Sequence, residues 1–462
     1  MNNIKNISIM IFCLLFTITL SGQEMTLEQC RKKAIENNKK ISIAYKNKEK
    51  ADLTVKSTFT NFLPKLSASG IAYYTSSKSD LALKLGSMQI FDPNLVSSIV
   101  PSQYYPIIEG LSVISLPDMN FRLNLNNTYL AGINLEQPIY MGGKIRAGYK
   151  MSKIGDEIAD LNIKLTESEV IVETDKAYWT YVQTLELQKS AKTYKETVEE
   201  FYRVVNNAVE TGMKSRNDLM KVQVQLNQAN LQLQRAENGV RLSGMNLCQI
   251  LGLPLLTDIM PSQSFNENIL SVNSEIDITT RPEYEMLNKQ IEFKVQEERV
   301  VRSDFLPSVG VRGAYNYTYG VKLNDDLLFD KGGFSAMVSV SIPLFHWGEG
   351  ARKIKIAETE RIITELQSYD LNEKMVLETQ QAIDKYNELL LEVAMTKTAL
   401  DQAQENLKMS KDYYEVGMES ISDYLEAQAI LQNAESEYIV AKTKLEIGKT
   451  EYLKAIGRLV VD

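Results

Sequence analysis

The sequence is poor in several of the features on which other protein classes depend. Its 462 residues include one histidine, two tryptophans and three cysteines. Beyond the first 23 positions there is no apolar run of about 18 residues, so no membrane-spanning helix is predicted there. If this chain crosses a membrane, it must do so as a closed β-barrel, because only helices and closed barrels satisfy every backbone polar group in lipid.

No catalytic set can be recognised in the sequence. There is no cluster of cysteine and histidine, no phosphate-binding loop and no nucleophile elbow. The single histidine, His346, lies beside Trp347 at a predicted strand-to-helix corner, where a packed residue is more common than a metal ligand. We therefore predict no enzyme activity, no metal and no cofactor. The alternative is an exported hydrolase that relies on carboxylates alone.

The first 22 residues resemble a secretory signal peptide. Lys5 precedes the mostly apolar run 7–20, and Ser21 and Gly22 provide small residues for cleavage. A membrane anchor is the alternative, but it would need about 20 apolar residues. Position 23 is Gln23, so no cysteine follows the cleavage site for lipid attachment.

Net charge and cysteine content narrow the choice of partners and of compartment. The formal net charge is −8, which disfavours nucleic acid as a partner of an exported protein. Removal of the signal peptide leaves Cys30 and Cys248. They allow one disulfide at most, and two buried free thiols are the alternative that we favour.

The chain repeats one plan twice. The segments VETGMKSRNDLMKVQ at 209–223 and YEVGMESISDYLEAQ at 414–428 share Gly, Met, Ser and Asp at the same spacing. Sliding the sequence against itself by 205 residues aligns Gly212 with Gly417, and the register continues to the end of both segments without a gap. This period is far too long for a solenoid of small repeats.

An insertion distinguishes the first copy from the second. The motif FLP at 62–64 recurs at 305–307 with an offset of 243, whereas Pro138 and Pro343 keep the offset of 205. The first copy therefore carries 38 extra residues (243 − 205). The predicted domains are a signal peptide at 1–22, a first repeat at 23–253, a linker at 254–280 and a second repeat at 281–462. Each repeat begins with a helix, and the second of these covers 281–304.

Two strands are predicted in each repeat. Apolar or aromatic residues alternate there with small or polar residues, which is typical of a strand with one apolar face. Such a strand can be half-buried in a sandwich, or it can line a membrane barrel with its apolar face toward lipid. The runs are about 10 residues long, which suits a tilted membrane strand. The predicted strands lie near 64–76, 120–137, 307–320 and 333–343.

Long helices follow the strands. Lys144 to Thr211 is a run of 68 residues without proline, about 100 Å of helix at ~1.5 Å per residue, which no ordinary globular core accommodates. In the return helices, apolar or small residues alternate at spacings of three and four, which favours coiled-coil packing over a broad amphipathic stripe. The predicted helical hairpins are 144–251 and 350–457.

A short turn joins the two helices of each hairpin. Gly212 and Gly417 stand where a glycine lets a chain reverse after a helix. Each glycine is followed by a serine with an aspartate three residues later, which resembles a capping box with Asp in place of Glu. These pairs are Ser215 with Asp218 and Ser420 with Asp423.

The ordered and duplicated set of motifs resembles the TolC family of outer-membrane efflux and secretion channels. The resemblance covers essentially the whole mature chain, through FLP, PIYMGG or PLFHWG, the long helix and the turn GMxSxxD. It implies a mainly α fold in which three copies form a twelve-stranded barrel in the outer membrane, continued by a helical barrel in the periplasm. It also implies a passive homotrimeric exit duct whose partners are outer-membrane lipid, a periplasmic adaptor, and an inner-membrane efflux pump or ABC exporter.

Functional residues are carried over from the family by position. The docking turns would be Gly212 with Met213 and Gly417 with Met418. An acidic periplasmic aperture would be formed by Asp423 and Glu426, and Tyr414 and Asp218 would latch neighbouring helices. Glu419 stands where an arginine is often found, so the geometry of the latch stays open. A solvated acidic helix end is the alternative to a gate.

Two further points stay open at this level. A soluble periplasmic coiled-coil adaptor is the rival interpretation of the heptad hairpins, although adaptors lack four strands with aromatic faces. The extra segment, roughly Ser77 to Met119, is expected to face outward, because long loops of such barrels are extracellular. Neither the cargo nor the partner pump can be deduced from the residues.

Overall fold

The structure is a computed structural model, and part of the chain is described by it. The predicted signal peptide at 1–22 lies outside the described residues, as does much of the predicted outer loop at 77–119. The described residues are 23–83, 87–89, 101, 103, 106–107, 113–115, 119–262, 265, 270–271 and 276–459.

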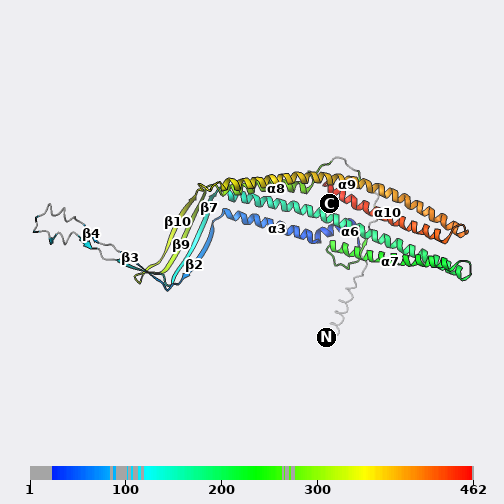
Figure 1. Ribbon diagram of the computed structural model, residues 1–462, viewed down its shortest axis with the longest axis horizontal. Coiled ribbons are helices and arrows are strands. Elements are labelled where there is room, and N and C mark those ends of the chain that lie inside the picture. The colour runs from blue at the N-terminus through cyan, green and yellow to red at the C-terminus, as the bar shows by residue number, and fades with distance from the viewer. Residues whose placement is uncertain are drawn as a thin grey trace, which may run out of the picture. The chain divides into compact units, whose positions relative to one another are not determined.

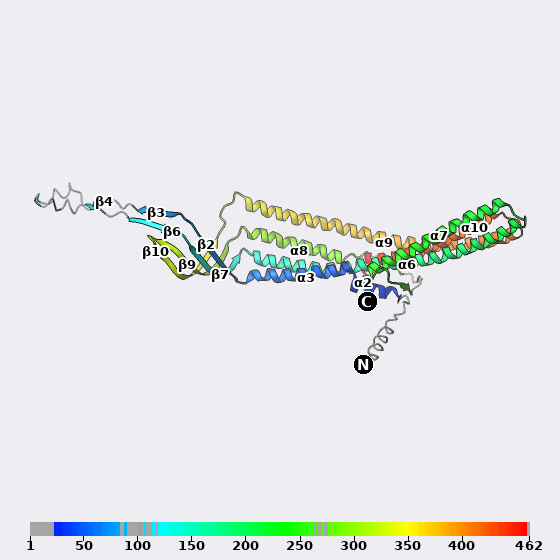
Figure 2. The ribbon, with the colours of Figure 1, turned by 90° about the horizontal axis from the view of Figure 1, so that it is seen from below.

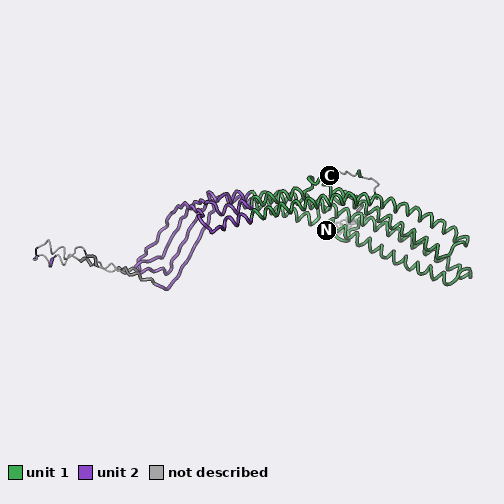
Figure 3. Tube along the Cα trace, turned by 45° about the horizontal axis from the view of Figure 1, so that its top comes forward, with its two compact units in different colours: residues 1–55, 150–296, 357–462 green, residues 56–149, 297–356 purple. Residues whose placement is uncertain are grey.

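The chain divides into two compact units, which Figure 3 shows in different colours. The first unit contains residues 1–55, 150–296 and 357–462 and is helical. The second contains residues 56–149 and 297–356 and holds the large sheet together with the helix ends that lead to it. Each unit therefore draws segments from both sequence repeats.

Two helical hairpins dominate the first unit (Figures 1 and 2). Helices α6 (Lys144–Glu210) and α9 (Glu349–Glu415) have 67 residues each, and the return helices α7 (Arg216–Ile250) and α10 (Ile421–Ala455) have 35 each. None of the four contains proline, which would break an interior helical turn. Their bounds differ from the predicted hairpins by a few residues at most.

Shorter helices pack beside α6. They are α2 (Leu27–Asn37), α3 (Lys39–Phe59) and α8 (Pro282–Ser303). Lys48 of α3 forms ion pairs with Asp156 at 2.8 Å and Asp160 at 2.6 Å, and Lys289 of α8 pairs with Glu157 at 2.8 Å. Helix α6 is thus joined by ion pairs to a short helix from each repeat.

The largest core cluster of the first unit gathers α2, α6 and α7 around Tyr178 and Trp179, which pack edge-to-face. Cys30 and Cys248 both belong to it; they are fully buried and not bonded to each other. Burial raises the pKa of the Cys30 thiol to about 12. The expectation of two buried free thiols is confirmed.

A buried ionic network joins three of these helices. Asp175 of α6 is fully buried and accepts two hydrogen bonds from Arg31 of α2, one of them at 2.7 Å from Nε. Thr450 of α10 donates its hydroxyl to the same carboxylate at 2.6 Å. A buried carboxylate is tolerated when it is paired and hydrogen-bonded in this way. The network fixes the N-terminal helix against both hairpins.

The second unit is built on a six-stranded sheet. Its long strands are β2 (Lys65–Tyr73), β7 (Thr128–Met141), β9 (Ser308–Leu323) and β10 (Asp326–Ser341), which pair antiparallel in that order. The shorter β6 (Met119–Asn124) pairs with β9, and β3 (Lys78–Leu83) pairs with β6. A short 3₁₀ turn, Thr60–Phe62, leads into β2.

Strand register brings the predicted apolar residues of the four long strands to one face. Ile133 lies opposite Tyr315, and Tyr315 lies opposite Phe334. Residues that pair directly across antiparallel strands share a face. The opposite face is polar: Arg312 donates to the Asn134 side chain at 3.0 Å and lies 3.4 Å from a carboxylate oxygen of Glu136.

Two of the predicted strands have different bounds. The strand predicted near 120–137 is broken, because Asn127 takes a positive φ of 55° and forms a turn between β6 and β7. The strand predicted near 333–343 begins earlier, at Asp326. Asn324 and Asp325 have φ values of 53° and 70°, so they form the two-residue hairpin turn that suits strand twist.

The remaining described strands are short. β1 (Gln23–Met25) pairs in parallel with β8 (Ile259–Pro261), and β4 (Ser87–Gln89) pairs antiparallel with β5 (Val113–Ser115). Among the described residues, no helix combines the length and apolar character needed to cross a bilayer.

Candidate functional site: the two hairpin tips

The first tip is a Schellman turn at the end of α6. The amide of Gly212 donates to the carbonyl of Val209 at 3.0 Å, and the amide of Met213 donates to the carbonyl of Ala208 at 2.8 Å. Gly212 has a φ of +76°, which side-chain-bearing residues rarely adopt. These two hydrogen bonds satisfy carbonyls that a helix end otherwise leaves open.

The second tip repeats this geometry. Gly417 also has a φ of +76°, and its amide donates to the carbonyl of Tyr414 at 3.1 Å. The amide of Met418 donates to the carbonyl of Tyr413 at 2.9 Å. The two copies of the sequence therefore form the same backbone turn.

Both tips present a methionine to solvent. In a Schellman turn the residue after the glycine often packs its apolar side chain against the last helical turn. Met213 is 73% exposed and Met418 is 80% exposed, so neither side chain is covered in this way. Methionine is flexible and adapts to irregular apolar surfaces, which makes these two positions candidates for contact with a partner.

The return helices begin with the capping boxes that the sequence predicts. The Asp218 amide donates to the Ser215 hydroxyl oxygen at 3.2 Å, and that hydroxyl donates to the Asp218 carboxylate at 2.7 Å. The corresponding distances at Ser420 and Asp423 are 3.3 Å and 2.7 Å. The hydrogen bond from Ser215 lowers the pKa of the Asp218 carboxyl.

The two proposed aperture acids are not equivalent in this structure. Asp423 is committed to the helix cap, since the Ser420 amide also donates to its carboxylate at 3.2 Å. Glu426, three residues later on the same exposed side of α10, has no ion pair or hydrogen bond with the described residues. Of the two carboxylates, that of Glu426 is the one without a hydrogen-bond partner among the described residues.

Tyr414 belongs to an aromatic cluster that joins the two hairpins. Its ring stacks on Tyr424 of α10 with centroids 5.4 Å apart, and it meets Phe201 of α6 edge-on at 5.5 Å. Lys214, from the first tip, lies over the Tyr414 ring with its ammonium 5.0 Å from the centroid. A cation over an aromatic face is attracted by the ring quadrupole.

The predicted latch pair interacts through charge but is not hydrogen-bonded. Burial raises the pKa of the Tyr414 hydroxyl, and the negative charge of Asp218 raises it further, so the two groups lie within electrostatic range. No hydrogen bond joins them within the described part of the chain. Close to the tips, a polar bond between the hairpins comes instead from Lys221 of α7, which donates to the Ser422 hydroxyl at 2.9 Å.

Sequence reasoning missed Phe201, Lys214 and Tyr424 of this cluster, and it also missed the bond from Lys221. Lys214 could have been noticed, because it takes the place that Glu419 holds in the second copy. Glu419 itself has one carboxylate oxygen that is shielded from solvent and makes no hydrogen bond.

The described residues contain no group of three or more His, Cys, Asp or Glu side chains arranged to hold a metal ion. The tips combine exposed methionines, capped helix starts, an aromatic cluster between the hairpins, and the carboxylates of Glu419 and Glu426, which make no ion pair or hydrogen bond with the described residues. Such a surface is suited to contact with another protein.

Two solved outer-membrane channels share this fold. The CmeC channel of Campylobacter jejuni matches with a TM-score of 0.74 at 20% identity, covering 93% of this chain and 85% of CmeC. The open state of the MtrE channel of Neisseria gonorrhoeae matches with a TM-score of 0.71 at 17% identity, covering 94% of this chain and 90% of MtrE. The protein thus has the fold of outer-membrane channels.

The family profile described as outer membrane efflux protein matches residues 30–253 and 288–458. The chain therefore belongs to that family, and the resemblance to TolC-type channels is confirmed. It is also 23% identical over 325 residues to the alkaline protease secretion protein AprF of Pseudomonas aeruginosa; the alignment covers 66% of this chain and 64% of AprF.

Family membership settles the location and the general class. The chain is an outer-membrane protein of the TolC type that extends into the periplasm, as predicted. Its family is one of transport channels and not of enzymes, and a soluble periplasmic adaptor is not favoured.

Proposed function

We propose that this protein is a passive exit duct of a tripartite efflux or type I secretion system, in which three copies close a twelve-stranded barrel. The observation that carries this proposal is the pairing of the four long strands. Within the described residues, β2 pairs only with β7, and β10 pairs with β9 alone, so one edge of each stays open. An open edge is a template for another strand, and closure of the sheet by neighbouring copies removes it.

The two faces of the sheet fit opposite surroundings. An apolar and aromatic face suits lipid, whereas the face with Arg312, Asn134 and Glu136 suits a water-filled lumen. Tyr129, Tyr319 and Phe334 remain 50%, 42% and 79% exposed in the single chain, which is unfavourable for a protein surrounded by water alone.

The trimer is tested by electrophoresis of detergent-extracted outer membrane. We expect a heat-modifiable band at three times the chain mass, converted to the monomer on boiling. A purified protein that stays monomeric and soluble without detergent, and passes no ions across a planar bilayer, would falsify the duct.

The hairpin tips are proposed to dock a periplasmic adaptor that leads to an inner-membrane pump or ABC exporter. The exposed methionines support this, because each tip offers an uncovered apolar side chain on a fixed turn. Met213→Asp with Met418→Asp should abolish export in cells without reducing the amount of trimer. The matched control is Met220→Asp on the side of α7, where the side chain is 48% exposed; it should leave export intact.

The periplasmic aperture is proposed to select cations through Glu426 and Asp423, contributed by each of three copies. Clustered carboxylates attract cations and repel one another. Because Asp423 is held in a cap and Glu426 is free, Glu426→Gln should reduce cation preference more than Asp423→Asn. Bilayer reversal potentials in a salt gradient measure this, and an unchanged preference in the double variant rules out the acidic gate.

A further inference from the structure

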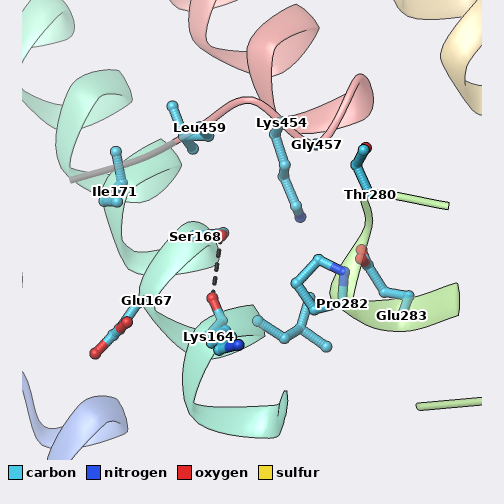
Figure 4. A pocket seen from close by; sticks show the side chains of 11 residues that line it. Lys164, Glu167, Ser168, Ile171, Thr280, Pro282, Glu283, Lys454, Gly457 and Leu459 are labelled. Atoms are coloured by element: carbon cyan, nitrogen blue, oxygen red, sulfur yellow. Dashed lines mark hydrogen bonds between the residues drawn. The ribbon is translucent and has the colours of Figure 1, made fainter. Parts of the chain in front are cut away.

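A cavity lies in the first unit, where the two sequence repeats meet. Its volume is about 280 Å³, and its walls come from α6, from the residues that open α8 and from the end of α10 (Figure 4). The lining includes Lys164, Glu167, Thr280, Glu283, Lys454 and Gly457. None of them belongs to the tips.

A hydrogen bond and a close approach at a glycine hold the walls of this cavity in place. The hydroxyl of Thr280 donates to the carbonyl of Ile456 at 3.3 Å, which joins the start of α8 to the end of α10. Gly457 has a φ of +66°, and a Cβ built there would lie only 2.5 Å from the Thr280 hydroxyl. The close approach of these two segments therefore requires glycine, and the shape of the cavity is set by the fold.

The two carboxylates of the lining have partners elsewhere. Burial opposes ionisation of Glu283, yet its pKa is lowered by the hydrogen bond and charge of Arg281, with a smaller contribution from Lys454. Arg281 is almost fully buried and lies 2.9 Å from the Glu283 carboxylate. Glu167 accepts a hydrogen bond from Tyr45 of α3 at 3.3 Å and turns away from the cavity in Figure 4.

The two lysines of the lining make no direct polar bond, although the charge of Lys454 acts on Glu283. Neither Lys164 nor Lys454 forms an ion pair or a side-chain hydrogen bond with the described residues. Figure 4 shows the side chain of Lys454 reaching into the space between α6 and the start of α8. Each ammonium group carries three donors, which a bound anion can satisfy.

The internal duplication shows that these charges are not a general property of the repeat. At an offset of 205 residues, Lys454 corresponds to Gln249 and Lys164 corresponds to Tyr369. Both equivalents are uncharged at pH 7, so the pair of cations is specific to this one junction.

We propose that the cavity binds a small dicarboxylate, with one carboxylate on Lys164 and the other on Lys454. The apolar residues Leu165, Ile171 and Leu459 accommodate the short carbon chain between the two charges. At roughly 30 Å³ per water, the volume corresponds to about nine waters, enough for an acid of four carbons. The bound anion ties α6 of the first repeat to α10 of the second.

The test is calorimetric titration of the full-length protein in detergent with succinate at constant ionic strength. We expect saturable binding that weakens about tenfold in Lys164→Gln and in Lys454→Gln, since a charge-assisted hydrogen bond is worth about one decade of affinity. The double variant should not bind detectably. Lys164→Arg with Lys454→Arg should keep the affinity within about threefold, because both cations remain.

Two controls separate a site from a general effect of charge. Lys192→Gln with Lys408→Gln removes the same charge at exposed positions outside the cavity and should leave succinate binding unchanged. Succinamide, which has nearly the same shape without charge, should not bind. The proposal fails if the wild type shows no saturable binding, if the control variant weakens binding equally, or if succinamide binds as well as succinate.

Discussion

The two hairpin tips have the same backbone and different side chains. Their glycines share a φ of +76°, and both tips have the same pair of turn hydrogen bonds and the same capping box. Lys214 in the first tip nevertheless corresponds to Glu419 in the second, and Arg216 corresponds to Ile421. From 210 to 218 there are two acids and two bases, whereas from 415 to 423 there are three acids and no base.

Because of this difference in charge, the two copies of the tip make different contacts. The positions that fix the turn are constrained by backbone geometry, so they stayed the same in both copies. The positions between them face outward and are free to change. Lys214 now reaches the second hairpin through Tyr414, whereas Glu419 makes no hydrogen bond through its shielded oxygen. The first tip supplies the contact and the second receives it.

The largest effect is expected where the tips are identical. Gly212→Ala and Gly417→Ala should each destabilise their turn by about 1–2 kcal/mol, because a Cβ strains the left-handed conformation. No atom lies within 4 Å of either Cβ position, so the cost is confined to the backbone and should be equal. Hydrogen exchange of the Met213 and Met418 amides measures it. Gly155→Ala, inside α6, should instead be neutral or stabilising.

The capping serines provide a second test of whether the two tips are equally stable. Ser215→Ala and Ser420→Ala should each cost about 1 kcal/mol at the start of the return helix, because an amide loses its partner. Threonine at either position should restore most of the loss. Exchange rates of the first-turn amides of α7 and α10 report the effect, and a cost at one tip only would contradict the equivalence of the two caps.

Removal of a charged side chain should affect the two tips differently. Lys214→Gln should cost about 0.5–1 kcal/mol of coupling to Tyr414, as measured by a double-mutant cycle with Tyr414→Leu. Glu419→Gln should cost nothing measurable in the same cycle, because its shielded carboxylate oxygen has no partner to lose. Equal coupling at both positions would mean that the contact over Tyr414 is not specific to the first tip.

The smallest effect concerns the ionisation of Tyr414. Burial and the Asp218 charge raise the pKa of this hydroxyl in the folded state, so folding favours its protonated form. The stability gained is fully present below the ordinary tyrosine pKa of about 10 and is lost as pH rises through the folded value. Asp218→Asn should bring the pKa down, as followed by tyrosinate absorbance against a Tyr414→Phe reference. Asp423→Asn, at the equivalent cap of the second tip, should leave the pKa of Tyr414 unchanged.

Much of the local structure was accessible from the sequence. Proline-free runs with three-four spacing predicted both hairpins, and the Gly and Ser-Asp pattern predicted the turn and the cap at each tip. The strands were located approximately, but their ends were not predicted. A turn at Asn126 and Asn127 divides one predicted strand. A turn at Asn324 and Asp325 moves the start of another strand to Asp326. Turn residues of this kind are weak signals, since asparagine and aspartate are also common in loops.

The sequence by itself determined the duplicated plan, the helix lengths and the turn chemistry, because these depend on neighbours within a few residues along the chain. Only the tertiary structure decided which side chains meet across hairpins. The Phe201, Tyr414 and Tyr424 cluster, the bond from Lys221 to Ser422 and the cavity between Lys164 and Lys454 join residues far apart in the chain. Such contacts depend on how helices pack against one another, which spacing along a single helix does not encode.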